Sequence, residues 1–501
     1  MSLTLRLFIW LVVITNLPLS GLGPAAANGS IRVGVQTLPA GLGSPYGSFN
    51  LATALPLDAV FDGLTLIGAS GDIERALAVS WQADTPLTWV FQLREGVAFS
   101  NGEPFDARAV VAAAEVLQGD AAGTSLGTTF KRLGVTGVSA QGDFKVAFTL
   151  AQPNALFAQY MSALRIPAPA ALSDAGLDGF ALAPVGTGPF HAMEWGEANV
   201  RMTAFKGSWR APALDGLEIL QLADGATRRQ GILSGSLDVA FGLAPEDKDL
   251  IEGVGGRMWV RPEPGVNFLA FITVKDSPLQ DVRVRHALNH AVNKQRIIDA
   301  FLDGAVPPAS QIAHSMSFGV NTDLQPYAYD PERARKLLAE AGYAGGFDMP
   351  TLVVPGGNAN SQDWYQLIAQ DLAAIGVRVE LRASTLPRYL EYMYSGGWPS
   401  LAFGMSTYTF DPIAGYRIRS CAWTHPYHCD PEIMPLIEAA QSAATLAERR
   451  DRTFAVLRHE HENPPGIFLW QGVSFEGLGP RIGAYWSAAD TVRVENITVR
   501  D

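Results

Sequence analysis

The sequence predicts an α/β protein, in which short helices and short strands alternate along most of the chain. Residues 145–150 (KVAFTL) show strand-like alternation, whereas residues 330–342 (DPERARKLLAEAG) carry a helix cap, a proline in the first turn and a closing glycine. The length of 501 residues corresponds to about three domain-sized units. Hydrophobic residues make up 48% of the chain and charged residues 17%, so a large core can form.

Local patterns place the individual elements. Strands are predicted where apolar residues alternate or run together, at residues 31–36, 89–93, 145–150, 268–274, 377–381 and 466–470. Helices are predicted after a capping residue or along an apolar stripe: from Asp106, as one long helix within 278–304 that Asp281 caps, and at 330–342, 362–374, 432–447 and 449–459.

The first 27 residues have the pattern of a secretory signal peptide. Arg6 precedes a short apolar run at residues 7–19, and Ala25 to Ala27 fit the small-residue cleavage site. A membrane anchor is the alternative, but this run is shorter than the roughly 20 residues that a spanning helix needs. We therefore expect cleavage near Ala27 and a soluble mature protein in the periplasm.

Charge and cysteine content narrow the possible partners. The formal net charge of −12 argues against nucleic acid or an anionic membrane as a main partner. Both cysteines, Cys421 and Cys429, lie in the segment CAWTHPYHC, and in an oxidising compartment such a pair favours a disulfide. His425 and His428 between them make a metal site the alternative, although the spacing fits no common zinc motif. We expect a disulfide, no metal and no cofactor.

Six segments in order along the chain resemble one protein family. They are VSW at 79–81, FQLREGVAFSNGEPF at 91–105, PVGTGPF at 184–190, LSGSLDVA at 233–240, PLQDVRVRHALNHAVN at 278–293 and DPERARKLLAEAG at 330–342. Together they resemble the extracellular solute-binding proteins of family 5, the large periplasmic receptors of oligopeptide, dipeptide and nickel ABC importers.

This resemblance implies a two-lobed type II periplasmic binding fold of the large cluster C type. Lobe I would comprise residues 28–55, 184–265 and 478–501, with an inserted subdomain at 56–183, and lobe II residues 266–477. The ligand would be enclosed between the lobes. Closure on the ligand would then let a monomeric receptor dock on the ABC permease subunits.

The resemblance also points to the ligand site, where the chain departs from the family. Peptide receptors of this family commonly carry Trp-x-x-Asp-x-x-Asp/Glu-Pro, whose middle Asp pairs with the peptide amino group. Here Asp411-Pro412 sets the register, so Tyr408 and Met405 stand where the Asp and the Trp should be. Asp411 is either a structural residue or, after a loop shift, a substitute for the missing acid.

The other residues expected at the ligand are polar or aromatic. The second-lobe set is Ser406, Tyr408, Phe410, Asp411 and Trp398, and the N-terminal cleft loop adds Tyr46, Phe49 and Asn50. Trp364, Arg388, Tyr389 and Tyr392 are weaker candidates. Hydroxyls and rings suit a neutral or stacked ligand as well as a peptide.

The leading hypothesis is therefore an ABC importer receptor for a peptide or related small solute. A nickel chelate, an opine or a sugar-like compound is an alternative ligand, and a ligand-binding sensor subunit is an alternative role for the same fold. A secreted enzyme is the remaining class, because Glu460 and Glu462 beside His459 and His461 could act as acid and base. No common catalytic motif accompanies them, so we expect no enzyme activity.

Overall fold

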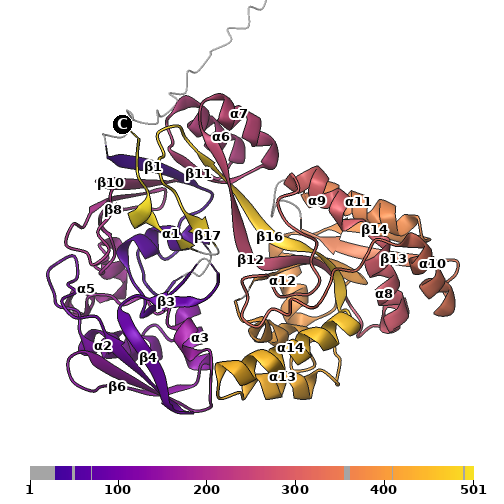
Figure 1. Ribbon diagram of the computed structural model, residues 1–501, viewed down its shortest axis with the longest axis horizontal. Coiled ribbons are helices and arrows are strands. Elements are labelled where there is room, and N and C mark those ends of the chain that lie inside the picture. The colour runs from indigo at the N-terminus through magenta and orange to yellow at the C-terminus, as the bar shows by residue number, and fades with distance from the viewer. Residues whose placement is uncertain are drawn as a thin grey trace, which may run out of the picture.

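The computed structural model describes residues 29–47, 51–68, 70–354, 361–408, 410–488 and 491–500. The chain forms two lobes joined by two long strands, β12 (Arg257–Phe271) and β16 (Gly466–Leu478), which run from one lobe into the other (Figure 1). The predicted signal peptide, residues 1–27, lies outside the described residues.

One sheet passes through both lobes. Its order is β14-β13-β15-β12-β16-β11-β1-β10-β9-β8, so the two crossing strands lie in the middle of the sheet. On the first-lobe side it contains β1 (Ser30–Val35), β8 (Phe190–Trp195), β9 (Asn199–Ala204), β10 (Gly216–Gln221) and β11 (Val239–Leu243). On the second-lobe side it contains β13 (Phe347–Val353), β14 (Val377–Ala383) and β15 (Ala402–Tyr408).

The first lobe carries a second, four-stranded antiparallel sheet of order β4-β5-β7-β6. Trp89, Phe91 and Phe148 of this sheet pack with Phe157 in the core of the lobe, which places the predicted strand face of 89–93 inside. Its strands are β4 (Ala78–Thr85), β5 (Thr88–Leu93), β6 (Val135–Ala140) and β7 (Lys145–Leu150), and two short pairs are β2 (Thr65–Ile67) with β3 (Ile73–Arg75) and β17 (Ser487–Ala488) with β18 (Thr491–Val492).

Helices cover the sheets of the first lobe. They are α1 (Leu51–Val60), α2 (Ala107–Gln118), α3 (Ser125–Arg132), α4 (Phe157–Tyr160), α5 (Pro169–Leu182), α6 (Gly225–Ser234), η1 (Pro245–Asp247), α7 (Lys248–Gly253) and η4 (Val494–Asn496). The cap predicted at Asp106 is confirmed, because its carboxylate accepts the backbone N–H of Arg108 at 2.8 Å. The predicted α/β class with two lobes is confirmed, whereas the expected residue limits of the lobes and of the inserted subdomain stay a prediction.

The second lobe contains the remaining helices of the described residues. They are η2 (Pro278–Gln280), α8 (Val282–Ala291), α9 (Lys294–Leu302), α10 (Pro331–Glu340), α11 (Ser361–Ala373), α12 (Leu386–Ser395), η3 (Pro412–Arg419), α13 (Met434–Gln441) and α14 (Leu446–Glu462). Asp281 and Asp330 cap α8 and α10 as predicted, through the N–H groups of Arg283 and Arg333.

The single long helix predicted within 278–304 is wrong. Val292 is extended, and Asn293 starts a new helix by accepting the N–H of Arg296 at 3.1 Å. The predicted helix 432–447 is also wrong in its limits, because α13 ends at Gln441 and Thr445 caps α14. In both places a side chain that can cap a helix lies inside a continuous apolar pattern, and the cap interrupts the helix.

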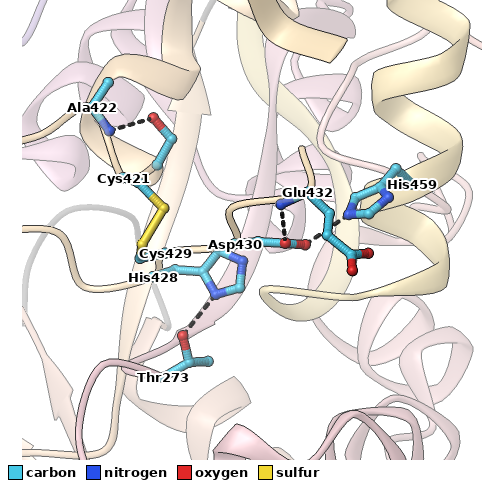
Figure 2. Close-up of a disulfide and its surroundings, with 9 residues drawn as sticks. Thr273, Cys421, Ala422, His428, Cys429, Asp430, Glu432 and His459 are labelled. Carbon is cyan, nitrogen blue, oxygen red and sulfur yellow. Dashed lines mark hydrogen bonds and ion pairs between the residues drawn. A yellow bond between two sulfur atoms is a disulfide. The ribbon is translucent and has the colours of Figure 1, made fainter. Parts of the chain in front are cut away.

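Cys421 and Cys429 form the predicted disulfide, with their Cα atoms 4.5 Å apart. The two sulfur atoms are therefore bonded to each other, so neither is a thiolate that could bind a metal. Figure 2 shows how the neighbouring residues fix the loop: His428 bonds Thr273, which follows β12, at 2.8 Å, and Asp430 pairs with His459 of α14 at 2.7 Å. Burial lowers the pKa of His428 to about 4, so this ring is neutral at pH 7.

Reduction of this disulfide is expected to lower the free energy of unfolding by about 2–3 kcal/mol, because the bond restricts a short loop in the unfolded chain. Urea unfolding with and without a thiol reductant measures the difference. The double variant Cys421→Ser/Cys429→Ser is the control and should not respond to the reductant. An equal urea midpoint for the oxidised and reduced protein would contradict the expected contribution.

Candidate functional site

Two cavities flank Pro264 of β12, where the chain passes between the lobes. The first, of about 350 Å³, is lined by the first lobe, including α1, β2 and α4, and by Phe410 and Asp411 of the second. The second, also about 350 Å³, is lined by Glu263, Gly265 and second-lobe residues of β15 and α11. The predicted residues Phe410 and Asp411 thus meet at the first cavity, and Ser406 lines the second.

Asp411 is held in a buried cluster with Arg449 and Tyr160. The guanidinium of Arg449, on α14, donates to both carboxylate oxygens, at 2.8 and 3.0 Å, and the Tyr160 hydroxyl donates to one of them at 3.1 Å. Asp411 also caps η3 by accepting the N–H of Ile413 at 3.0 Å. Because Tyr160 belongs to the first lobe and the other two residues to the second, this cluster ties the lobes together.

Further contacts join the lobes around the first cavity. Gly71, in the turn between β2 and β3, lies so close to the second lobe that an added Cβ would be 2.1 Å from the carbonyl oxygen of Met316. Met316 packs with Phe410 and with Trp486 of the first lobe. On another part of the boundary Lys248 pairs with Asp303 at 3.2 Å. The lobes are therefore in contact, and the cavity lies between touching surfaces.

The carboxylates of the first cavity on the first-lobe side are also paired. Asp58 binds the guanidinium of Arg165 at 2.9 Å, and Asp62 binds that of Arg210 at 2.7 Å. Asp62 additionally accepts the hydroxyl of Thr187 and the indole N–H of Trp209. The remaining lining of this cavity is largely apolar, with Phe61, Leu66, Ile67, Pro264, Phe410 and Val492 among its members.

The second cavity has a polar pair on its floor. Ser406 and Asn267 face each other across β15 and β12, and the Ser406 hydroxyl donates to Asn267 Oδ1 at 2.5 Å. Trp364 and Tyr365 of α11 form another wall, and Tyr365 lies against Gly404. The sequence did not single out Asn267, because the predicted strand begins at Phe268, whereas in the structure Asn267 lies inside β12.

A family model decides what kind of protein this arrangement belongs to. Residues 72–422 match the model of the bacterial extracellular solute-binding proteins, family 5. The chain belongs to this family. The predicted membership of family 5 is thereby confirmed. The prediction of no enzyme activity is confirmed as well, because family 5 consists of non-catalytic solute-binding proteins.

Curated relatives and solved structures agree with family 5 membership. The glutathione-binding protein GsiB of Escherichia coli O1:K1 is 29% identical over 353 residues, which cover 68% of this chain and 66% of that protein. The chain therefore matches slightly less than two thirds of this relative's length. Among solved structures, DppA of Helicobacter pylori in complex with the peptide STSA matches with a TM-score of 0.75 at 20% identity, covering 95% of this chain and 98% of that one.

A further structural match is NikA from Brucella suis in complex with Fe(III)-EDTA. Its TM-score is 0.81 at 23% identity, covering 94% of this chain and 100% of that one. At such identities these likenesses establish the fold of the family. Among the residues that the structure describes, no helix combines the length and apolarity needed to cross a membrane.

Two of the other predicted ligand residues are buried in hydrophobic cores. Tyr46 is completely buried in the first-lobe core, and Trp398 stacks on Phe403 in the second-lobe core with ring centroids 4.1 Å apart. Tyr408 pairs with Gly265 across β15 and β12, while its side chain lies outside the described residues, as do Phe49 and Asn50. The binding roles of the predicted residues stay a prediction.

The acid–base group considered from the sequence does not assemble. Glu460 is buried within the second lobe, accepts the hydroxyl of Tyr416 at 2.6 Å, and has its pKa raised to about 7 by burial. Its neighbour His459 turns to Asp430 instead, at 2.7 Å. Neither side chain lines the first or the second cavity, and each is bound to a structural partner.

Proposed function

We propose that this chain is the substrate-binding component of an ABC importer, which captures a peptide or related small solute between its lobes in the periplasm. The observation that carries the proposal is the first cavity, whose walls come from both lobes. A solute in such a cavity contacts both lobes only when they are closed, so it favours the closed form. The closed form would then be delivered to the permease subunits, after cleavage of the leader near Ala27.

Peptides are the favoured ligand class because the relatives include a glutathione-binding protein and a peptide-bound receptor. A non-peptide solute, such as a nickel chelate, an opine or a sugar-like compound, is the second candidate. Two observations favour it: Tyr408 replaces the acid that pairs with a peptide amine, and the neighbouring Asp411 is already bonded to Arg449. A sensor subunit of the same fold remains an alternative role.

Native mass spectrometry of gently purified protein tests ligand capture, together with thermal unfolding in the presence of glutathione and mixed short peptides. At a ligand concentration of 100 times Kd, binding is expected to add about 2.7 kcal/mol to the free energy of unfolding. A bound mass series matching short peptides would support peptide capture, and a single non-peptide mass would transfer the proposal to the second ligand class. Absence of any retained or stabilising solute would contradict the receptor function.

A further inference from the structure

The connection between α9 and α10 is unusually long and is held by its own side chains. It runs from residue 303 to residue 330, whereas connections between elements usually span roughly 4–6 residues and long ordered ones are often functional. Within it the ends of the segment 311–321 are joined, because Gln311 donates to the Asn321 carbonyl oxygen at 2.8 Å and accepts the Asn321 N–H at 3.1 Å. We call residues 311–321 the strap.

The strap is anchored to the second lobe beside the crossing strand β16. The hydroxyl of Thr407, on β15, donates to the carbonyl oxygen of Ile312 at 3.1 Å. The N–H of Ser315 donates to the side-chain oxygen of Gln471 at 3.4 Å, and Gln471 lies at the register shift between β12 and β16. The strap is therefore part of the second lobe and moves with it when the lobes separate.

His314 fixes the conformation of the strap's tip. It is 2% exposed, and its ring Nδ1 accepts the backbone N–H of Met316 at 3.1 Å. The His314 N–H donates to the Ser317 hydroxyl at 3.1 Å, and the Ser317 N–H donates back to the His314 carbonyl oxygen at 2.8 Å. Burial lowers the pKa of His314 to about 4, so the ring is neutral at pH 7 and Nδ1 stays an acceptor. Met316 is thereby held in one position.

The tip meets the first lobe at a surface whose own parts are bonded together. Met316 is 7% exposed and packs against Trp486, and its carbonyl oxygen lies close to Gly71 in the turn between β2 and β3. Arg493 lies over the Trp486 ring, 5.8 Å from its centroid, and pairs with Glu74 of β3 at 2.6 Å. The tail and the β2–β3 pair thus form one surface, and separation of the lobes would expose the part of Met316 that this surface covers.

We propose that the strap stabilises the closed arrangement of the lobes, with Met316 as its contact with the first lobe and His314 as the positioning residue that presents Met316. The inference goes beyond the proposed function, because it concerns the chain itself and holds for any solute. Burial of an apolar side chain between the lobes favours their contact. Because the strap is already folded on the second lobe, little conformational entropy is lost when the lobes meet.

Replacement of Met316 by serine tests the inference on purified protein that has been freed of retained solutes by dialysis. The variant should raise the radius of gyration in small-angle X-ray scattering. It should also speed amide hydrogen exchange in residues 70–75 by about tenfold, a typical effect of losing part of one buried apolar side chain. Both readouts are taken without solute, so their outcome is independent of whether the protein captures one.

Met393→Ser is the matched control. Met393 is 6% exposed and lies in a core of the second lobe, so the variant should lower the melting temperature while leaving the radius of gyration and the exchange in residues 70–75 unchanged. Parent-like radius and exchange in Met316→Ser, or equal changes in the two variants, would overturn the inference.

Two variants of His314 test its positioning role. His314→Leu removes the acceptor of the Met316 N–H and should reproduce the changes of Met316→Ser. His314→Asn also loses the ring, but its side-chain oxygen accepts the N–H two residues on, as in an Asx-turn, and should restore the radius of the parent protein. Equal behaviour of the two variants would reject His314 as the positioning residue. If His314→Leu does not fold, Met316→Ser and Met393→Ser still decide the inference, because the Met316 side chain makes none of the strap's hydrogen bonds named above.

Discussion

Replacement of Arg449 by alanine is expected to lower the free energy of unfolding by about 3–5 kcal/mol, which is the usual cost of leaving one partner of a buried ion pair alone. Both Arg449 and Asp411 are at most 8% exposed in their side chains, so water cannot replace the lost guanidinium. The same guanidinium also donates to the carbonyl oxygen of Ala440 at the end of α13. The variant therefore loses an ion pair and a helix–helix contact together.

Urea unfolding of the unliganded protein measures this loss. Arg458→Ala is the matched control, because it lies exposed on the same helix and should change the free energy by less than about 0.5 kcal/mol. The double variant Asp411→Asn/Arg449→Ala should recover part of the loss, since it no longer buries an uncompensated charge. If the double variant is no more stable than Arg449→Ala, the cost comes from packing and not from the isolated carboxylate.

Replacement of Gly71 by alanine is expected to weaken ligand capture by at least tenfold, because the new Cβ would hold the lobes apart. Its position 2.1 Å from the Met316 carbonyl oxygen is too short for any side chain, and a backbone atom cannot rotate away. The apparent affinity of a receptor falls with the fraction of molecules able to close, so a destabilised closed form lowers it in proportion.

Gly102→Ala is the control for the backbone strain that accompanies this change. Gly71 and Gly102 have φ values of +84° and +90°, but an added Cβ at Gly102 meets no atom within 4 Å. Both variants should lose similar stability from the left-handed conformation. Only Gly71→Ala should shift small-angle X-ray scattering of the unliganded protein to a larger radius of gyration and reduce the stabilisation by any ligand found among glutathione and mixed short peptides. Equal behaviour of the two variants would show that Gly71 does not limit closure.

The sequence predicts an element correctly where residues within that element determine its start or its bond. Asp106, Asp281 and Asp330 cap helices where the pattern predicts them, and the cysteine pair forms its disulfide. The break at Asn293 is absent from the prediction, and the predicted break between the helices at 432–447 and 449–459 lies a few residues beyond Thr445. In both places only the cap geometry fixes where the new helix starts.

The site depends on contacts that no local pattern contains. Asp411-Pro412 suggested a special position, but its partner Tyr160 is 251 residues away in sequence and Arg449 is 38 residues away.

The position of β16 in the shared sheet has a consequence for how the chain reaches its native state. β16 lies between β11 and β12, so the strands of the first lobe that begin at residue 30 cannot join the rest of the sheet until residues 466–478 are present. Contacts between such distant segments form late and slowly. Ribosome-bound chains therefore lack the strand that completes the sheet, and assembly of the sheet waits for the end of synthesis.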